Sequence, residues 1–418
     1  MKHNAELSTQ SNIRNDYLVF GSPIINDEEI EEVVDSLKSC WLGTGPKVAR
    51  FEEKFRSYIG SDYALAVNSC TAGLHLSLTV AGVGPGDEVI TTAMTFAATV
   101  NAITHTGATP VLVDVDRNTG LIDPERIREA ITPQTKAIVP VHLYGRPCNM
   151  DDIMAIAGEH NLIVIEDAAH AIETVYKGRK IGTIGHMAAF SFYVTKNITT
   201  GEGGMVTTND PEFADKIKVY ALHGMSKDAW KRFSDEGYKH YQVVAPGFKY
   251  NMMDIQAAIG IHQMDHLGSW LLRRNEIWQR YNEAFVDLPV TLPAGDEPDT
   301  VHARHLYTLL IDEERAGISR DEFMNQLHKH NIGSGVHYLG VHLHPYYRDR
   351  FGYEPSDFPN ATYLSERTVS IPLSPKLQDS DVDYIIGVVR NILAEAAQER
   401  NQMQVHRSSA MAHSGATI

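Results

Sequence analysis

Short runs of β-branched and apolar residues alternate with helical patterns over the first 210 residues of the chain. The strand-like runs are Tyr63–Val67, Glu88–Thr91, Pro110–Asp114, Ala137–Val141, Leu162–Glu166, Ala188–Phe192 and Gly204–Thr208. Helix-like segments lie between the earlier runs, at Thr71–Val80, Ala97–Thr106, Pro124–Ala130 and Asp151–His160. Strands that alternate with helices are typical of a mostly parallel sheet with helices on both faces. The pattern therefore predicts an α/β fold.

The pattern changes near Asp254, where one long helical stretch begins and runs to about Phe285 with few breakers. It is followed by the apolar run Leu306–Ile311, a helix from Ser319 to about His330, and a helix from Asp379 to about Gln398. We expect a large domain with an N-terminal arm over residues 1–265 and a smaller α+β domain over 266–400. The end of the chain, 401–418, is polar and rich in small residues, so a disordered tail is expected there.

Composition narrows the classes of function. Of the 418 residues, 43% are hydrophobic and 22% charged, which excludes a disordered chain. The formal charge of −16 argues against nucleic acid or an anionic membrane surface as a partner. Three cysteines cannot form a disulfide framework, the N-terminus lacks a secretory signal, and no apolar stretch approaches the ~18 residues of a membrane span. A cytoplasmic protein is expected.

The segment Asn68–Leu78 is the first that indicates chemistry. Small and hydroxylated residues follow a predicted strand where a helix begins. Several backbone N–H groups are free at such a point, and the helix dipole adds positive potential, so the turn can hold a phosphate without a lysine. Plain N-capping by Ser69 or Thr71 explains the same pattern equally well.

Two more candidates lie at ends of predicted strands. Asp167 follows the most apolar strand, at the edge where open α/β sheets bind ligands, and a carboxylate there needs a cationic partner or several donors. Helix capping is the alternative role for Asp167, and His170 lies near the same opening. Lys196 precedes a loop rich in Thr and Gly. Burial or nearby positive charge would make its amine nucleophilic, whereas a solvated surface lysine is the alternative.

Three segments are specific when they occur together: Val164-Ile-Glu-Asp-Ala-Ala-His170, Ser191-Phe-Tyr-Val-Thr-Lys-Asn197 and Gly201-Glu-Gly-Gly204. With them the chain, from Trp41 to the C-terminal helix, resembles the DegT/DnrJ/EryC1/StrS family of sugar-nucleotide aminotransferases, which use pyridoxal 5′-phosphate (PLP). The resemblance implies fold type I of the PLP-dependent transferases, with a mostly parallel seven-stranded sheet in the large domain. Within the family, His170 and Pro246–Asn251 most resemble the enzyme that aminates UDP-4-keto-arabinose.

The resemblance also implies roles for single residues. Lys196 would form the Schiff base with the cofactor and later move a proton between cofactor and substrate. Asp167 would keep the pyridine nitrogen protonated, which makes the cofactor an electron sink. His170 would lie against the ring oxygen of the cofactor. Phe96 would stack on its ring, although a phenylalanine of the core is the alternative.

The implied phosphate site consists of backbone and hydroxyl groups of Cys70, Thr71, Ala72 and Ser191. In the family, an Asn of the partner subunit usually completes this site. The aligned motif here carries Lys249, whose charge suits a phosphate dianion, and Asn251 where an Arg is common. The resemblance thus implies a homodimer with shared active sites.

The implied reaction moves the amino group of glutamate, which becomes 2-oxoglutarate, to a ketone of a nucleotide-linked sugar, at C4 first and C3 second. The product would serve the synthesis of cell-surface polysaccharide, including lipopolysaccharide, or of amino sugars. Relatives that deoxygenate sugars replace the lysine with His, so Lys196 favours transamination. A PLP-dependent dehydratase or isomerase and a regulatory protein without activity stay open as alternatives.

Five histidines occur between Asn325 and Arg350: His328, His330, His337, His342 and His344. No neighbouring cysteines or carboxylates support a metal site. A solvated surface is the simplest interpretation, and the resemblance implies that His337 and Tyr338 lie beside the nucleotide sugar.

Overall fold

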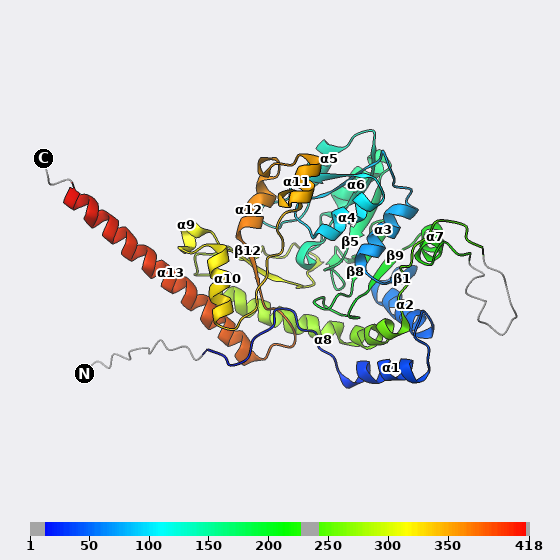
Figure 1. The fold of residues 1–418 in the computed structure, drawn as a ribbon, viewed down its shortest axis with the longest axis horizontal. Coiled ribbons are helices and arrows are strands. Elements are labelled where there is room, and N and C mark those ends of the chain that lie inside the picture. The colour runs from blue at the N-terminus through cyan, green and yellow to red at the C-terminus, as the bar shows by residue number, and fades with distance from the viewer. Residues whose placement is uncertain (1–12, 227–241, 415–418) are drawn as a thin grey trace.

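The computed structural model describes residues 13–226 and 242–414, and a seven-stranded sheet lies at its centre (Figure 1). The strand order is β1-β9-β8-β5-β4-β2-β3, formed by Tyr63–Val67, Gly204–Thr208, Met187–Ser191, Ile163–Asp167, Thr135–Val139, Glu88–Thr92 and Thr109–Val113. The strands from β8 to β3 are parallel, while β9 pairs antiparallel with both β8 and β1. The predicted mostly parallel seven-stranded sheet is confirmed, with strand ends shifted by one or two residues.

Both faces of this sheet are covered. Since side chains alternate along a strand, β5 places Val164 in one apolar cluster and Ile165 in another. The cluster of Ile165 includes residues of α3 (Cys70–Val80), α4 (Ala97–His105) and α7 (Pro211–Ala221). The cluster of Val164 includes residues of α2 (Pro46–Ile59), α5 (Pro124–Ala130) and α6 (Met150–His160). The carboxyl ends of the strands therefore meet at one edge of a buried sheet.

The long helix α8 (Asp254–Phe285) connects the two parts of the chain (Figure 1). Its side chains as far as Trp270 pack in the cluster of Val164, and those from Ile277 onward pack in a third cluster. The third cluster also holds residues of β11 (Tyr307–Leu310), β12 (Thr368–Ile371), α9 (Glu313–Ala316), α10 (Arg320–Lys329) and α13 (Asp379–Ser414). The change of core thus lies a few residues after the predicted boundary at 265/266.

The C-terminal part does not separate cleanly from the large sheet. Val341 and Leu364 belong to the cluster of Val164. The chain after Val341 forms α11 (Pro345–Phe351) and α12 (Pro359–Arg367), and Leu364 is part of α12. The short sheet β10-β6-β7, made of Thr300–Val301, Val175–Tyr176 and Arg179–Lys180, also joins the two parts. Single 3₁₀ turns occur at Leu143–Gly145, Val341–Leu343 and Pro355–Asp357.

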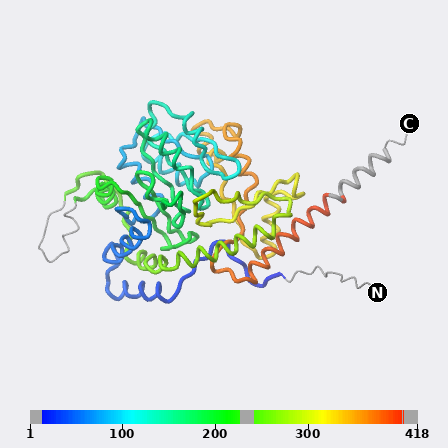
Figure 2. The backbone as a smooth tube through the Cα atoms, turned by 180° about the vertical axis from the view of Figure 1, so that it is seen from behind, coloured from blue at the N-terminus to red at the C-terminus, as the bar shows by residue number. Residues whose placement is uncertain are grey.

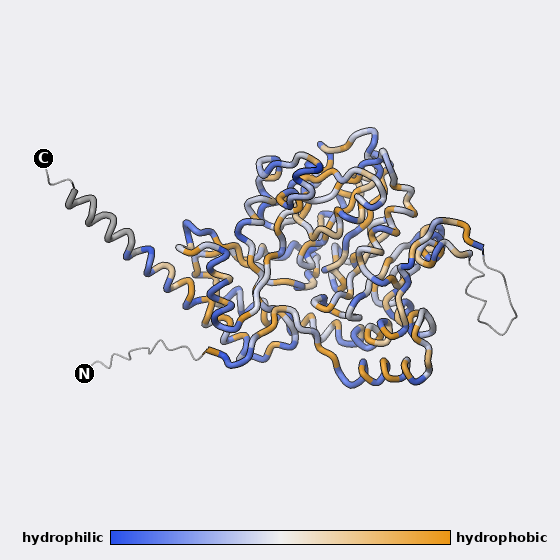
Figure 3. Tube along the Cα trace, in the orientation of Figure 1, coloured by the Kyte–Doolittle hydropathy of each residue, from blue (hydrophilic) through white to orange (hydrophobic). Residues whose placement is uncertain are grey.

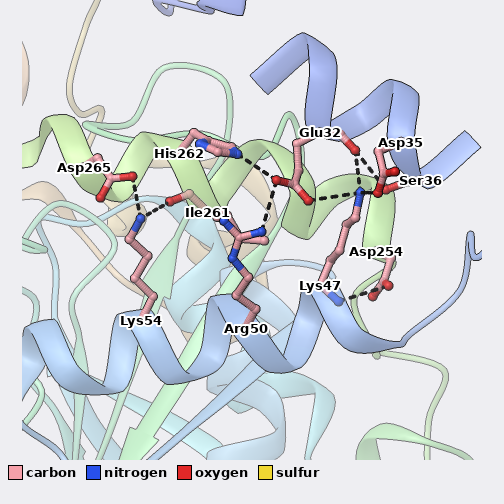
Figure 4. A network of polar contacts seen from close by, with 10 residues as sticks. All are labelled: Glu32, Asp35, Ser36, Lys47, Arg50, Lys54, Asp254, Ile261, His262 and Asp265. Carbon is pink, nitrogen blue, oxygen red and sulfur yellow. Dashed lines mark hydrogen bonds and ion pairs between the residues drawn. The ribbon is translucent and has the colours of Figure 1, made fainter. Parts of the chain in front are cut away.

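Several helices were not predicted, namely α7, α9, α11, α12 and, near the N-terminus, α1 (Asp27–Lys38) and α2. Hydrophobic and hydrophilic positions alternate along α1 (Figure 3). Polar contacts tie α1 and α2 to α8 (Figure 4). The Asp254 carboxylate accepts the backbone N–H groups of Lys47 and Val48 at 3.1 and 3.0 Å, which caps α2. Burial raises the pKa of Glu32, but hydrogen bonds from His262 and Lys47 outweigh it and lower this pKa to about 2. The N-terminal arm is thereby fixed to the long helix.

The prediction of a disordered tail is wrong as far as Ser414, because α13 continues to that residue (Figure 1). The part of α13 that Figure 2 draws in colour runs away from the body of the protein. The physical reason for the longer helix is composition: no Gly or Pro occurs from Val388 to Ser414, and Ala, Glu, Gln and Arg favour helix. Residues 415–418 lie outside the described chain. Within the described ranges, no helix is both long and apolar enough to cross a membrane.

Candidate active site

A cavity of about 500 Å³ opens at the carboxyl edge of the central sheet. Seven predicted site residues line it: Cys70, Thr71, Phe96, Asp167, His170, Ser191 and Lys196. Asp167 and Ser191 end the adjacent parallel strands β5 and β8, while Cys70 and Phe96 stand where α3 and α4 begin. The topology therefore brings together side chains that are far apart in the sequence, as the carboxyl edge of a parallel sheet does.

The start of α3 forms one end of the cavity. The Ser69 hydroxyl caps this helix by accepting the backbone N–H of Ala72 at 3.1 Å. The N–H of Ala72, which was predicted to bind phosphate, therefore already has an acceptor. The N–H groups of Cys70 and Thr71 have no acceptor within the described chain. Capping by Ser69 and free donors at Cys70 and Thr71 therefore occur together, and the positive end of the helix faces the Ser191 side of the cavity.

Asp167 is 5% exposed and has only neutral donors. Its carboxylate accepts the Thr99 hydroxyl at 2.7 Å and the backbone N–H of Ala169 at 3.1 Å. Burial raises the pKa of this carboxyl, and these two donors and the Lys196 charge oppose the rise. Asp167 thus both stabilises the turn after β5 and presents a desolvated carboxylate to the cavity.

Lys196 is not a solvated surface lysine. Burial lowers the pKa of its amine to about 8, although Cys70 and Asp167 act in the opposite direction. The amine has no hydrogen-bond partner among the described residues. A partly neutral, unpartnered amine inside a cavity has the properties of a nucleophile.

His170 is held by contacts on both ring nitrogens. Nδ1 accepts the backbone N–H of Tyr144 at 3.1 Å, and Nε2 lies 3.1 Å from the Tyr338 hydroxyl. Burial, with the nearby Lys196 and His305, lowers the pKa of His170 well below its ordinary value. The ring is therefore neutral with its proton on Nε2, which donates to the Tyr338 oxygen.

The profile of the DegT/DnrJ/EryC1/StrS aminotransferase family matches residues 23–390. This chain belongs to that family. The Bacillus subtilis spore coat polysaccharide biosynthesis protein SpsC is 52% identical over 384 residues, which are 92% of this chain and 99% of SpsC. The predicted membership of an aminotransferase family, and with it the predicted enzyme class, is confirmed.

Solved structures agree with this assignment. Spr1654 from Streptococcus pneumoniae, provisionally described as a sugar aminotransferase, has a PMP form with a TM-score of 0.85 and 34% identity, covering 92% of this chain and 100% of that one. Its PLP form gives 0.84 over 91% of this chain and 99% of that one. Helicobacter pylori PseC, an aminotransferase of pseudoaminic acid biosynthesis, gives 0.83 at 28% identity and covers 91% and 100% of the two chains. The predicted fold type I is confirmed.

Phe96 has the exposure that its family role requires. Its side chain is 60% exposed, lines the cavity and lies 5.7 Å from the ring of Tyr338. The alternative of a core phenylalanine is therefore wrong, and the face of the ring is free to stack on a flat ligand.

Three predicted residues do not line this cavity within one chain: Ala72, whose N–H is bound by Ser69, and Lys249 and Asn251. The Lys249 amine donates to the Asn251 side-chain oxygen at 2.7 Å, and the Asn251 amide donates to the Thr44 hydroxyl at 2.7 Å. Asn251 lines a separate cavity that Trp41 also lines. The predicted role of Lys249 and Asn251, in the site of a partner subunit, stays a prediction.

The C-terminal part supplies a wall that the sequence indicated only in part. His337 and Tyr338 line the cavity, and so does His305, to which we assigned no role. The one sequence feature that could have indicated His305 is its position directly before the apolar run that contains β11. The solvated-surface interpretation of this histidine-rich segment is wrong for His342, which is fully buried. Among the described residues, no group of three or more metal-ligating side chains occurs.

Proposed function

We propose that this protein is a PLP-dependent aminotransferase that transfers the amino group of glutamate to the ketone of a nucleotide-linked sugar, at C4 in preference to C3, for the synthesis of cell-surface polysaccharide. One observation carries the proposal: in an aminotransferase chain, Asp167, Lys196 and the start of α3 converge on one cavity. The relatives named for spore coat polysaccharide and for sugar transamination support the substrate class. The narrower resemblance to the enzyme of UDP-4-keto-arabinose stays a prediction.

The cavity offers a complementary group to each part of PLP. The free N–H groups of Cys70 and Thr71 and the Ser191 hydroxyl suit a phosphate. The Asp167 carboxylate, buried with neutral donors only, lacks the cation that a protonated ring nitrogen would provide. The exposed face of Phe96 suits the flat ring.

Bound here, PLP would supply an aldehyde that accepts the amino group and a ring that stabilises negative charge on the substrate carbon. Lys196 holds or delivers a proton at Nζ, because a pKa of about 8 keeps both forms of the amine populated near neutral pH. The Asp167 carboxylate would stabilise positive charge at the ring nitrogen of bound PLP. His170 keeps its Nε2 proton on the Tyr338 oxygen, so the Tyr338 hydroxyl proton is left to point to another acceptor.

The decisive experiment incubates the PLP-loaded protein with glutamate and a panel of nucleotide-linked keto-sugars, with products read by mass spectrometry. Replacement of a ketone oxygen by an amine raises the sugar mass by one unit, and fragmentation identifies C4 or C3. Lys196→Ala should lose both the visible absorbance of the loaded protein and the amine product. Lys54→Ala, which removes a surface amine paired with Asp265, is the matched control.

Three other outcomes contradict the proposal. A deoxygenated sugar without nitrogen would indicate the dehydratase or isomerase, and a protein that does not bind PLP would indicate the regulatory alternative. An unchanged spectrum in Lys196→Ala would remove Lys196 from its assigned role.

We further propose that the cytoplasmic enzyme is a homodimer in which Lys249 and Asn251 of one copy complete the phosphate site of the other. This is supported by their position outside the cavity of their own chain and by the family motif that they occupy. The test mixes Lys196→Ala with Lys249→Ala subunits. If sites are shared, mixed dimers contain one intact site and regain activity that neither variant has, whereas sites within single chains regain none.

A further inference from the structure

A largely buried chain of hydrogen bonds runs from α8 to His305, whose ring stacks on His170. Arg274 of α8 is 2% exposed and pairs with Glu173. The other carboxylate oxygen of Glu173 accepts Nδ2 of Asn197 at 2.7 Å, and Oδ1 of Asn197 lies 2.8 Å from Nδ1 of His305. Asn197 directly follows Lys196 in the sequence, and both line a small cavity together with Arg274 and His305.

The direction of these hydrogen bonds determines where the proton of His305 lies. Nδ2 of Asn197 donates both to Glu173 and to the carbonyl of Ala303, at 2.7 and 3.0 Å. Oδ1 of Asn197 is therefore an acceptor, and Nδ1 of His305 must be the donor. Burial and the nearby Lys196 lower the pKa of His305 well below its ordinary value, so the ring is neutral and Nε2 carries a lone pair.

A donor near this ring, the amine of Lys196, also lacks a partner among the described residues. Neither Nε2 of His305 nor the amine of Lys196 has a hydrogen bond within the described chain, and both residues line the main cavity. Both also line a small cavity of about 40 Å³ behind Lys196, together with Asn197 and Arg274. The face of the His305 ring stacks on His170, with centroids 4.3 Å apart and planes at 29°.

We propose that His305 is a positioning residue of the transamination site. Its unprotonated Nε2 accepts a hydrogen bond from the Lys196 amine when that amine is free, and its face supports His170. The chain Arg274–Glu173–Asn197 holds the ring in the tautomer that this requires. The inference rests on the proposed function, because the Lys196 amine becomes free only during transamination. The hydrogen bond to His305 would then fix the position of that amine.

The tautomer is tested without cofactor or activity. In full-length protein labelled with ¹⁵N-histidine, the His305 resonances are assigned by their loss in His305→Phe. We expect a neutral Nδ1–H ring that does not titrate between about pH 6 and 8, the interval in which an ordinary histidine does. In Asn197→Ala, the Nδ1–H form should give way to the Nε2–H form. An Nε2–H or charged His305 in the unaltered protein would overturn the proposal.

The role is tested by the rate at which glutamate bleaches the PLP-loaded enzyme. His305→Phe keeps a stacked ring but no acceptor, so we expect this rate to fall about tenfold with the KM for glutamate unchanged. His305→Gln, which restores an acceptor, should recover part of it. The matched control is His302→Phe, because His302 is equally buried but does not line the cavity.

An unchanged rate in His305→Phe, or an equal loss in His302→Phe, would overturn the positioning role. If His305→Phe does not fold, the His305 resonances are assigned by their loss in His305→Gln, and the tautomer and the His305→Gln rate then test the proposal. If the unaltered protein neither loads PLP nor reacts with glutamate, the proposed function is wrong. The tautomer measurement uses neither cofactor nor activity, so it still tests the hydrogen bonding of His305 separately.

Discussion

The two walls of the cavity are built in different ways. The strand-end wall, which consists of Cys70, Thr71, Asp167, Ser191 and Lys196, comes from the carboxyl edge of one sheet. The C-terminal wall, which consists of His305, His337 and Tyr338, comes from loops packed against that sheet. The first wall carries Asp167 and Lys196, the ionisable groups to which we assign the cofactor chemistry. The second carries neutral groups whose hydrogen bonds orient other side chains.

Burial disfavours the charged form of the ionisable side chains in both walls, but charges of opposite sign compensate for it only in the strand-end wall. In the strand-end wall burial raises the pKa of Asp167 and lowers that of Lys196 to about 8. The attraction between the two charges opposes both shifts. In the C-terminal wall burial lowers the pKa of His305 well below its ordinary value and that of His337 to about 4. Near neutral pH, therefore, charge resides on the strand-end wall, and the C-terminal wall acts through geometry.

The largest effect is expected from the strand-end wall. Asp167→Asn keeps the shape and the contact with Thr99 but removes the charge that stabilises a protonated ring nitrogen, so we expect the glutamate half-reaction to slow by about 10³-fold. Stopped-flow absorbance measures this rate. Asp151→Asn, which alters a surface carboxylate paired with Lys177 and Arg179, should have no effect. A loss below about tenfold would show that the Asp167 charge is not central.

The next effect concerns pH and Lys196. Its charged form predominates below a pKa of about 8 and its neutral form above it, so PLP loading of the cofactor-free protein should speed up about tenfold from pH 7 to pH 9. The Asp167 charge raises this pKa, so Asp167→Asn should move the midpoint to lower pH. Rapid-mixing absorbance at constant ionic strength gives the profile. A midpoint near pH 10.4, the ordinary value for lysine, would show that burial does not tune this amine.

The difference between the walls also explains what the sequence could predict. Asp167, Ser191 and Lys196 each end a strand or follow one closely, and adjacent parallel strands carry such residues to the same edge. Local patterns were therefore enough to place them together. His305 reaches the cavity only because α8 and the short sheet β10-β6-β7 bring the C-terminal part against the large sheet. No local pattern encodes that contact.

The helices at the two ends show the same limit. The capping box of α1, formed by Asn26 and Glu29, is a local signal that we did not use. The extension of α13 to Ser414 depends on the absence of breakers rather than on any apolar pattern. Roles assigned from the family alone, above all those of Lys249 and Asn251, depend on a second chain and stay predictions.

The smallest effect is expected from the C-terminal wall, in Tyr338→Phe. This change keeps the ring beside Phe96 and removes the hydroxyl that accepts Nε2–H of His170 at 3.1 Å. A buried donor without an acceptor costs about 1–3 kcal/mol, but His170 keeps its stacking on His305 and its bond from Tyr144, so we expect turnover to fall only about three- to tenfold. Steady-state kinetics with glutamate and the amino-accepting sugar measure this change.

Tyr347→Phe is the matched control, because the Tyr347 hydroxyl also makes a partly buried hydrogen bond, donated to Asn101 at 2.6 Å, but does not line the cavity. It should lower thermal stability by a similar amount and leave turnover unchanged. If Tyr338→Phe instead lost as much activity as Asp167→Asn, the Tyr338 hydroxyl would have to take part in moving a proton. The division into a charged reactive wall and a neutral orienting wall would then be wrong, since both walls would act directly on the reacting atoms.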